Sequence, residues 1–201
     1  MKRTILALAI AGTTLAFAPQ ARAYLYTTDA LEVAGQGRVT LVPGAGTLDF
    51  NSGVLPAGYS GGAIVQGTQI GVTIPPAGDD SPYWNVGPTH GEVGVAQFDA
   101  PLSYFGFDWS TRDDYNVFSL YRGGQLLVTL TGANFSGPSG YLNIFADNPS
   151  EWFDRVVLSS QINAFETDNH AWAAAVPEPS SYALMAVGLM VVAAVACRRL
   201  Q

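Results

Sequence analysis

Short hydrophobic runs alternate with polar residues through the middle of the chain, and glycine and proline separate them. A period of two is typical of half-buried β-strands. The clearest pair, 116–121 and 125–130, flanks Arg122-Gly123-Gly124, and paired glycines between two β-rich runs favour a hairpin. Further strands are expected at 38–42, 69–74, 93–98, 102–109, 141–145, 153–158 and 162–165.

The pattern predicts an all-β fold for residues 24–175. No amphipathic helix of 12 residues is evident there, and short strands with Gly/Pro turns indicate an antiparallel β-sandwich or jelly roll. Glycine-rich 43–62 predicts short or irregular strands, and 75–90 predicts a long loop. The expected core residues are Phe105, Phe107, Phe118 and Phe153.

The first 23 residues have the three-part layout of a secretory signal peptide. Lys2 and Arg3 precede an uncharged, mostly apolar stretch, and Ala21-Arg22-Ala23 is a small-x-small cleavage site, which predicts Tyr24 as the first mature residue. An N-terminal membrane anchor is the alternative, although the apolar run is short for a span.

A second apolar segment lies near the C-terminus. Residues 182–197 carry no charge and would form a helix of about 24 Å, so that 180–197 is at the short limit of a transmembrane span. Arg198 and Arg199 follow, and positive residues favour the cytoplasmic side. The preceding segment 176–179, Val-Pro-Glu-Pro, is predicted to be extended, because its two prolines disfavour helix and strand.

Proline-flanked glutamate, apolar helix and terminal arginine pair, in this order over 176–201, resemble the PEP-CTERM sorting signal. Such a tail is also called the ice-binding protein C-terminal domain, a label that implies no activity for this chain. The resemblance implies recognition by an exosortase, a membrane-embedded cysteine transpeptidase of Gram-negative bacteria. It also implies removal of the helix and transfer to the cell surface or exopolysaccharide matrix. The sorting residues would be Val176, Pro177, Glu178, Pro179, Arg198 and Arg199. An ordinary C-terminal anchor is the alternative.

A second, weaker resemblance covers residues 91–174. Its motifs are Phe105-Gly106-Phe107-Asp108-Trp109, Asp114-Tyr115-Asn116, Tyr121-Arg122-Gly123-Gly124 and Phe165-Glu166-Thr167-Asp168-Asn169. They are similar to other PEP-CTERM surface proteins with lectin-like or jelly-roll sandwiches. The resemblance implies a fold but no ligand.

Composition narrows the classes of partner. The one cysteine, Cys197, excludes an internal disulfide framework and a cysteine-rich metal site. Residues 24–175 hold four arginines, no lysine and 15 acidic residues, a balance of −11. Phosphate contacts need cations, so this charge disfavours nucleic acid and anionic membranes while tolerating divalent cations.

Two sets of residues are candidates for ligand binding. Trp84, Trp109 and Tyr115 each neighbour Asp or Asn, a pattern that suits stacking on sugar rings, although aromatic residues in strands more often form core. The loop containing Asp147 and Glu151 is a weak calcium candidate, since calcium prefers carboxylate and carbonyl oxygens.

No catalytic motif is evident. The histidines are His90 and His170, the latter expected at the surface, and no G-x-S-x-G elbow is present. Two carboxylates could form the active site of a glycan hydrolase, but among 15 acidic residues two carboxylates will often lie close together by chance. The sequence favours a non-catalytic exported matrix protein, with a carbohydrate-binding module, supported by calcium, as the alternative and a glycan hydrolase as the third possibility.

Overall fold

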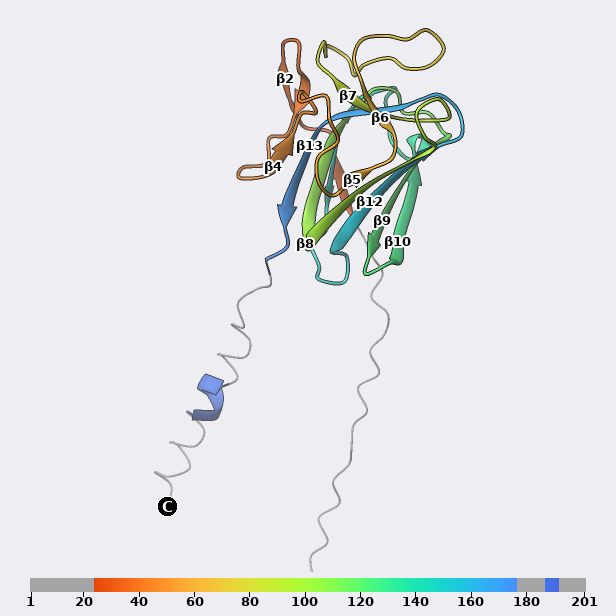
Figure 1. Cartoon of the computed structure of the whole chain (residues 1–201). Coiled ribbons are helices and arrows are strands. Elements are labelled where there is room, and N and C mark those ends of the chain that lie inside the picture. The colour runs from red at the N-terminus through yellow and green to blue at the C-terminus, as the bar shows by residue number, and fades with distance from the viewer. Residues whose placement is uncertain (1–23, 177–186, 192–201) are drawn as a thin grey trace, which may run out of the picture.

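The computed structural model describes residues 24–176 and 187–191 (Figure 1). The predicted signal peptide 1–23 and the sorting residues Pro177, Glu178, Pro179, Arg198 and Arg199 lie outside these ranges. Within them, the strands are β1 (Leu25–Thr27), β2 (Leu31–Val33), β3 (Gly37–Val39), β4 (Gly46–Leu48), β5 (Tyr59–Ser60), β6 (Ala63–Val65), β7 (Tyr83–Val86), β8 (Val93–Trp109), β9 (Asn116–Arg122), β10 (Gln125–Thr131), β11 (Gly140–Phe145), β12 (Phe153–Ser160) and β13 (Phe165–Ala174). One 3-10 turn, Gly132–Asn134, follows β10.

The long strand β8 organises the fold. Its first half pairs antiparallel with β12, and its second half pairs antiparallel with β11 and β13. The sheet therefore curls over on itself, with β10-β9-β12 on one side of β8 and β1-β11 and β13 on the other. Figure 1 shows β13 on one side of the domain and β9 and β10 on the other. The predicted antiparallel all-β fold is confirmed.

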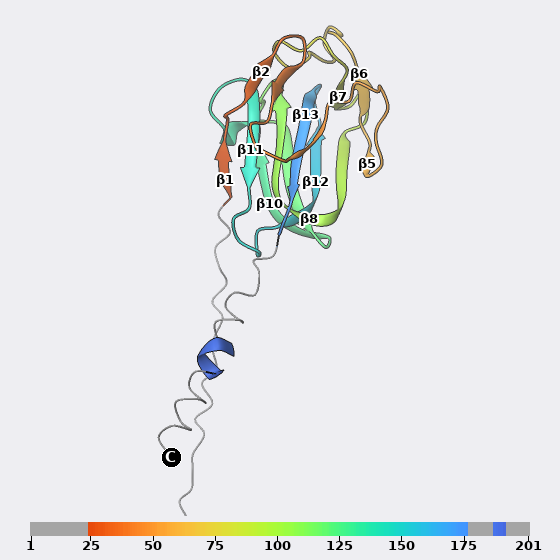
Figure 2. The ribbon, with the colours of Figure 1, turned by 90° about the vertical axis from the view of Figure 1, so that its left-hand side faces the viewer.

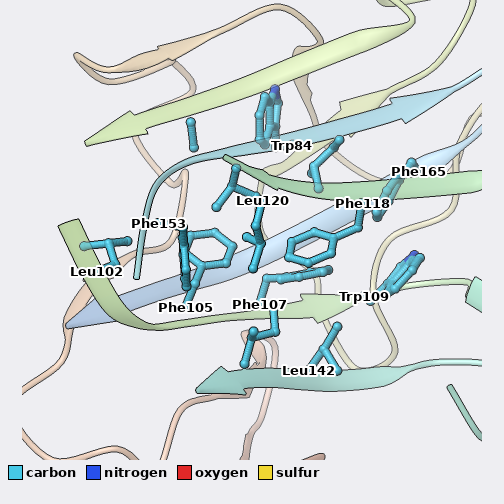
Figure 3. Close-up of a cluster of buried hydrophobic side chains, with 14 of the residues drawn as sticks. Trp84, Leu102, Phe105, Phe107, Trp109, Phe118, Leu120, Leu142, Phe153 and Phe165 are labelled. Atoms are coloured by element: carbon cyan, nitrogen blue, oxygen red, sulfur yellow. The ribbon is translucent and has the colours of Figure 1, made fainter. Parts of the chain in front are cut away.

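The space between the two sides is filled by aromatic residues. Phe105, Phe107, Phe118 and Phe153 are all fully buried, as the strand pattern predicted, and lie together in Figure 3. Successive side chains of a strand point to opposite faces, so residues 105 and 107 of β8 share the inner face. Removing these side chains from water is the main source of stability in such a layer.

The predicted hairpin is also confirmed. β9 and β10 pair antiparallel from Arg122 opposite Gln125 to Val117 opposite Thr131. Gly123 and Gly124 form the connection with φ of 54° and 82°, values that glycine adopts without steric cost.

Three local predictions were wrong. Residues 69–74 form a turn closed by Gln69 and Thr73 rather than a strand, and Ile70 is 97% exposed. The expected loop 75–90 contains the fully buried strand β7. The expected last strand, 162–165, instead begins at Phe165 and continues to Ala174. The sequence of this strand, FETDNHAWAA, shows no apolar alternation. Its polar side chains can still lie inside the domain, because most of them find partners elsewhere in the fold.

Both ends of the domain lie together. The chain enters β1 and leaves β13 at the same end of the sheet (Figure 2). The Ala175 N–H donates to Pro101 O (2.8 Å), which fixes the exit from β13 against β8. In the described ranges, no helix is both long and apolar enough to cross a membrane, and most of the predicted span 180–197 lies outside them.

Candidate functional site

Two of the three predicted glycan-binding aromatics belong to the core. Trp84 and Trp109 have no exposed surface, so they cannot stack on a sugar, and this prediction was wrong (Figure 3). Trp84 Nε1–H donates to Gly61 O (2.9 Å), while the Trp109 ring stacks on Phe165 at 4.7 Å. An adjacent Asp or Asn does not determine which face of a strand an aromatic side chain occupies.

Tyr115 lies half-buried at the surface, between two hollows. It follows β8 in the turn before β9, and its hydroxyl donates to Asp113 Oδ2 (2.8 Å), which holds the ring in place. One hollow, of about 220 Å³, extends toward Glu166, and the other, of about 360 Å³, extends toward Ile162. We refer to these two hollows and their lining residues as the Tyr115 cleft.

Glu166 supplies a buried carboxylate to this cleft. It stands at the start of β13, is only 2% exposed, and accepts the Ile74 N–H at Oε1 (2.8 Å). Its Oε2 is buried and has no hydrogen-bond partner among the described residues. Burial raises the pKa of Glu166, while the Ile74 N–H and the Thr73 hydroxyl oppose the shift.

A second group of carboxyls lies beneath the β2–β3 hairpin, and we call Asp79, Asp108 and Asp168 the carboxyl cluster. All three side chains are at most 3% exposed, and Asp108 and Asp168 are opposite each other on β8 and β13. The backbone N–H of Arg38 donates to Asp108 Oδ2 (2.8 Å), and its guanidinium lies 3.4 Å from Oδ1.

The other two carboxyls of this cluster share Ser81, whose hydroxyl contacts Asp79 Oδ1 and Asp168 Oδ2. Asp79 Oδ2 and Asp168 Oδ1 are buried, and no donor from another described residue reaches them. Burial raises the pKa of Asp168 to about 10, and the hydrogen bond and negative charge of Asp79 raise it further in the same direction. Asp168 therefore keeps its proton at neutral pH, and this proton can supply the missing donor.

The geometry around Gly37 leaves no room above the cluster. Gly37 has φ of 70°, and a Cβ there would lie 2.8 Å from Asp108 Oδ2. Asp108 itself has a pKa raised to about 6 by burial, with Arg38 opposing the shift. Closed in this way, the carboxyl cluster supports the fold and is not an open site.

The two carboxyls of the predicted calcium loop lie in different surroundings. Asp147 is exposed, while Glu151 is buried and accepts the Asn148 N–H at Oε2 (3.1 Å), which closes the loop on itself. Across the described part of the chain, no three His, Cys, Asp or Glu side chains converge to hold a metal ion.

His170 is not at the surface, contrary to the prediction. It is fully buried, its Nδ1 lies 3.1 Å from the Tyr59 hydroxyl, and its Nε2 lies 2.9 Å from Thr167 Oγ1. Burial lowers the pKa of His170 to about 3, so it is neutral at physiological pH. His90 Nδ1 contacts Asn85 Oδ1 (2.8 Å).

Comparison with known families assigns the C-terminal segment. Residues 175–199 match the model of the PEP-CTERM protein-sorting motif. The chain carries this sorting motif. It implies processing by an exosortase, hence export and a membrane-anchored intermediate before display at the cell surface. Neither the curated proteins nor the solved structures include a significant match to the chain.

Sequence reasoning missed Glu166 and the Asp79–Asp168 pair as special carboxyls. No local pattern marks them, because Glu166 and Asp168 have hydrogen-bond partners 92 and 87 residues away in the chain. One signal was available. Charged residues make up only 12% of the chain, and an acid inside a strand such as β13 is unusual unless it has a partner.

Proposed function

We propose that this chain is an exported surface or extracellular-matrix protein of a Gram-negative bacterium, with a non-catalytic β-sandwich. The observation that carries the proposal is the PEP-CTERM motif at 175–199, which begins where β13 ends. In this proposal the signal peptide 1–23 directs export, the helix 180–197 holds the chain in the inner membrane, and an exosortase then releases the domain among exopolysaccharides.

A non-catalytic role agrees with the surroundings of the histidines. His170 and Thr167 form a hydrogen-bonded pair, but both are fully buried and out of reach of substrate. A serine-type hydrolase needs its nucleophile and base at an open site. The strongly acidic domain agrees with a place among hydrated polymers, since net charge keeps proteins soluble.

Intact mass and cell fractionation test the sorting proposal directly. The native protein from its own host should lack residues 1–23 and the residues beyond about Pro179, and should occur in the surface or matrix fraction. A protein found in the inner membrane, with a mass that still includes Cys197 and Arg198-Arg199, would contradict the proposal. Replacing Glu178 by alanine provides the matched variant, which should accumulate with its tail uncleaved.

Absence of catalysis is tested with sugar polymers. Cellohexaose, mannohexaose and maltohexaose, incubated with the full-length chain, are expected to keep their length when followed by chromatography. Accumulation of shorter oligosaccharides above a boiled-protein control would show that the non-catalytic assignment is wrong.

A further inference from the structure

We propose that the Tyr115 cleft binds a neutral saccharide through ring stacking on Tyr115 and hydroxyl donation to Glu166. This goes beyond the proposed matrix role and does not depend on how the chain is sorted. The site differs from the predicted aromatic set, since Trp84 and Trp109 are buried in the core and only Tyr115 remains at the surface.

The unpartnered oxygen of Glu166 selects for a ligand with hydrogen-bond donors. A carboxylate only accepts hydrogen bonds, and a buried acceptor without a donor is unfavourable, the more so when it is charged. Oε1 is already held by the Ile74 N–H at 2.8 Å, so Oε2 is the free position, and Glu166 lines the smaller hollow. Sugar hydroxyls are donors of the required kind.

The remaining lining fits a polyol better than a metal ion or an apolar molecule. Amide and hydroxyl side chains, which both donate and accept, border the two hollows together with apolar ones. The polar members are Thr73, Thr111 and Asn163 in the smaller hollow and Ser159, Ser160 and Gln161 in the larger. Ile74 and Ile162, 55% and 54% exposed, offer apolar surface for the C–H faces of a sugar ring.

Charge restricts the saccharide to a neutral one. Asp113 and Glu166 border the smaller hollow, and among the described residues no lysine, arginine or histidine lines either hollow. An acidic sugar would meet like charge without a cation to pair with it. Because Tyr115 borders both hollows, its ring would separate two adjacent subsites, which suits an oligosaccharide.

The ring is also held before any ligand arrives. The Tyr115 hydroxyl donates to Asp113 Oδ2 (2.8 Å), and Asp113 O in turn accepts the N–H groups of Asn116 and Gly132 (each 3.1 Å). Preorganisation of this kind lowers the entropy lost on binding.

Titration calorimetry on the full-length chain, in a detergent without sugar headgroups, tests the proposal. The neutral probes are cellohexaose, laminarihexaose, mannohexaose and maltohexaose, and the acidic probe is an alginate hexasaccharide. At least one neutral probe should bind, and the alginate should not. Tyr115→Ala and Glu166→Gln should each weaken binding about tenfold, while Tyr115→Phe should retain most of it.

A matched control separates loss of the site from loss of the fold. Trp152 is also half-buried but lies elsewhere, against Arg122 at 5.9 Å, so Trp152→Ala should bind like the wild type. Glu166→Gln keeps the acceptor for Ile74, and its circular dichroism and melting temperature should remain close to those of the wild type. The proposal is overturned if no neutral probe binds, if alginate binds more tightly, or if folded Tyr115→Ala binds with unchanged affinity.

Discussion

Replacing Trp84 with alanine is expected to lower the free energy of unfolding by about 3–5 kcal/mol. The side chain has no exposed surface, and its ring lies against Tyr59, Phe50 and His170 at centroid distances of 5.3, 6.0 and 5.7 Å. Removal leaves a cavity that these rings cannot fill, and the Gly61 carbonyl loses its donor. Urea unfolding, followed by circular dichroism, measures the change.

Two comparisons distinguish the core role of Trp84 from a surface role. Tyr115→Ala is expected to cost only about 1 kcal/mol, because Tyr115 is half-buried at the surface. Trp84→Phe should cost more than Trp109→Phe, since Trp84 Nε1 has a partner, whereas Trp109 Nε1 is buried with no partner in the described part of the chain. Similar losses for Trp84→Ala and Tyr115→Ala would contradict the assignment of Trp84 to the core.

The parts of the fold that sequence could predict are those with a local signal. The hairpin β9–β10 is marked by its paired glycines, and Phe105 and Phe107 are marked by their spacing of two. Strand β7 carried no such signal, because it is four residues long inside a proline-rich stretch, and its burial depends on β6 and β13.

The candidate site shows the same division between local and distant signals. Tyr115 could be proposed because Asp114 and Asn116 flank it in the sequence. The role of Glu166 could not, because it depends on the Ile74 N–H, 92 residues away. β13 looks like a loop in sequence, and only the folded sheet shows that Thr167, Asp168 and His170 are inside it. Buried polar groups are recognisable only once their partners are known.

The carboxyl cluster gives the domain a stability that should fall as pH rises. The pKa of Asp168 is about 10 in the folded chain, against an ordinary value of 3.8. Between these values the folded state holds a proton that the unfolded state has released, so the unfolded state binds fewer protons and stability decreases with pH. The slope is about 1.4 kcal/mol per pH unit for one proton. Buried His170, whose pKa is lowered to about 3, acts in the opposite direction, but only below its ordinary value of 6.5.

Asp168→Asn is therefore expected to remove most of the loss of stability between pH 7 and pH 9, and to be more stable than the wild type at pH 9. The asparagine amide can donate to Asp79 in place of the Asp168 proton. The measurement is urea unfolding at several pH values in EDTA, so that no divalent cation replaces the proton. Asp108→Asn is the matched control, because Asp108, with a pKa of about 6, has largely lost its proton by pH 7 and should leave the slope in place. A wild type whose stability is constant from pH 7 to 9, or an Asp168→Asn variant with the wild-type slope, would show that Asp168 does not keep its proton in the folded domain.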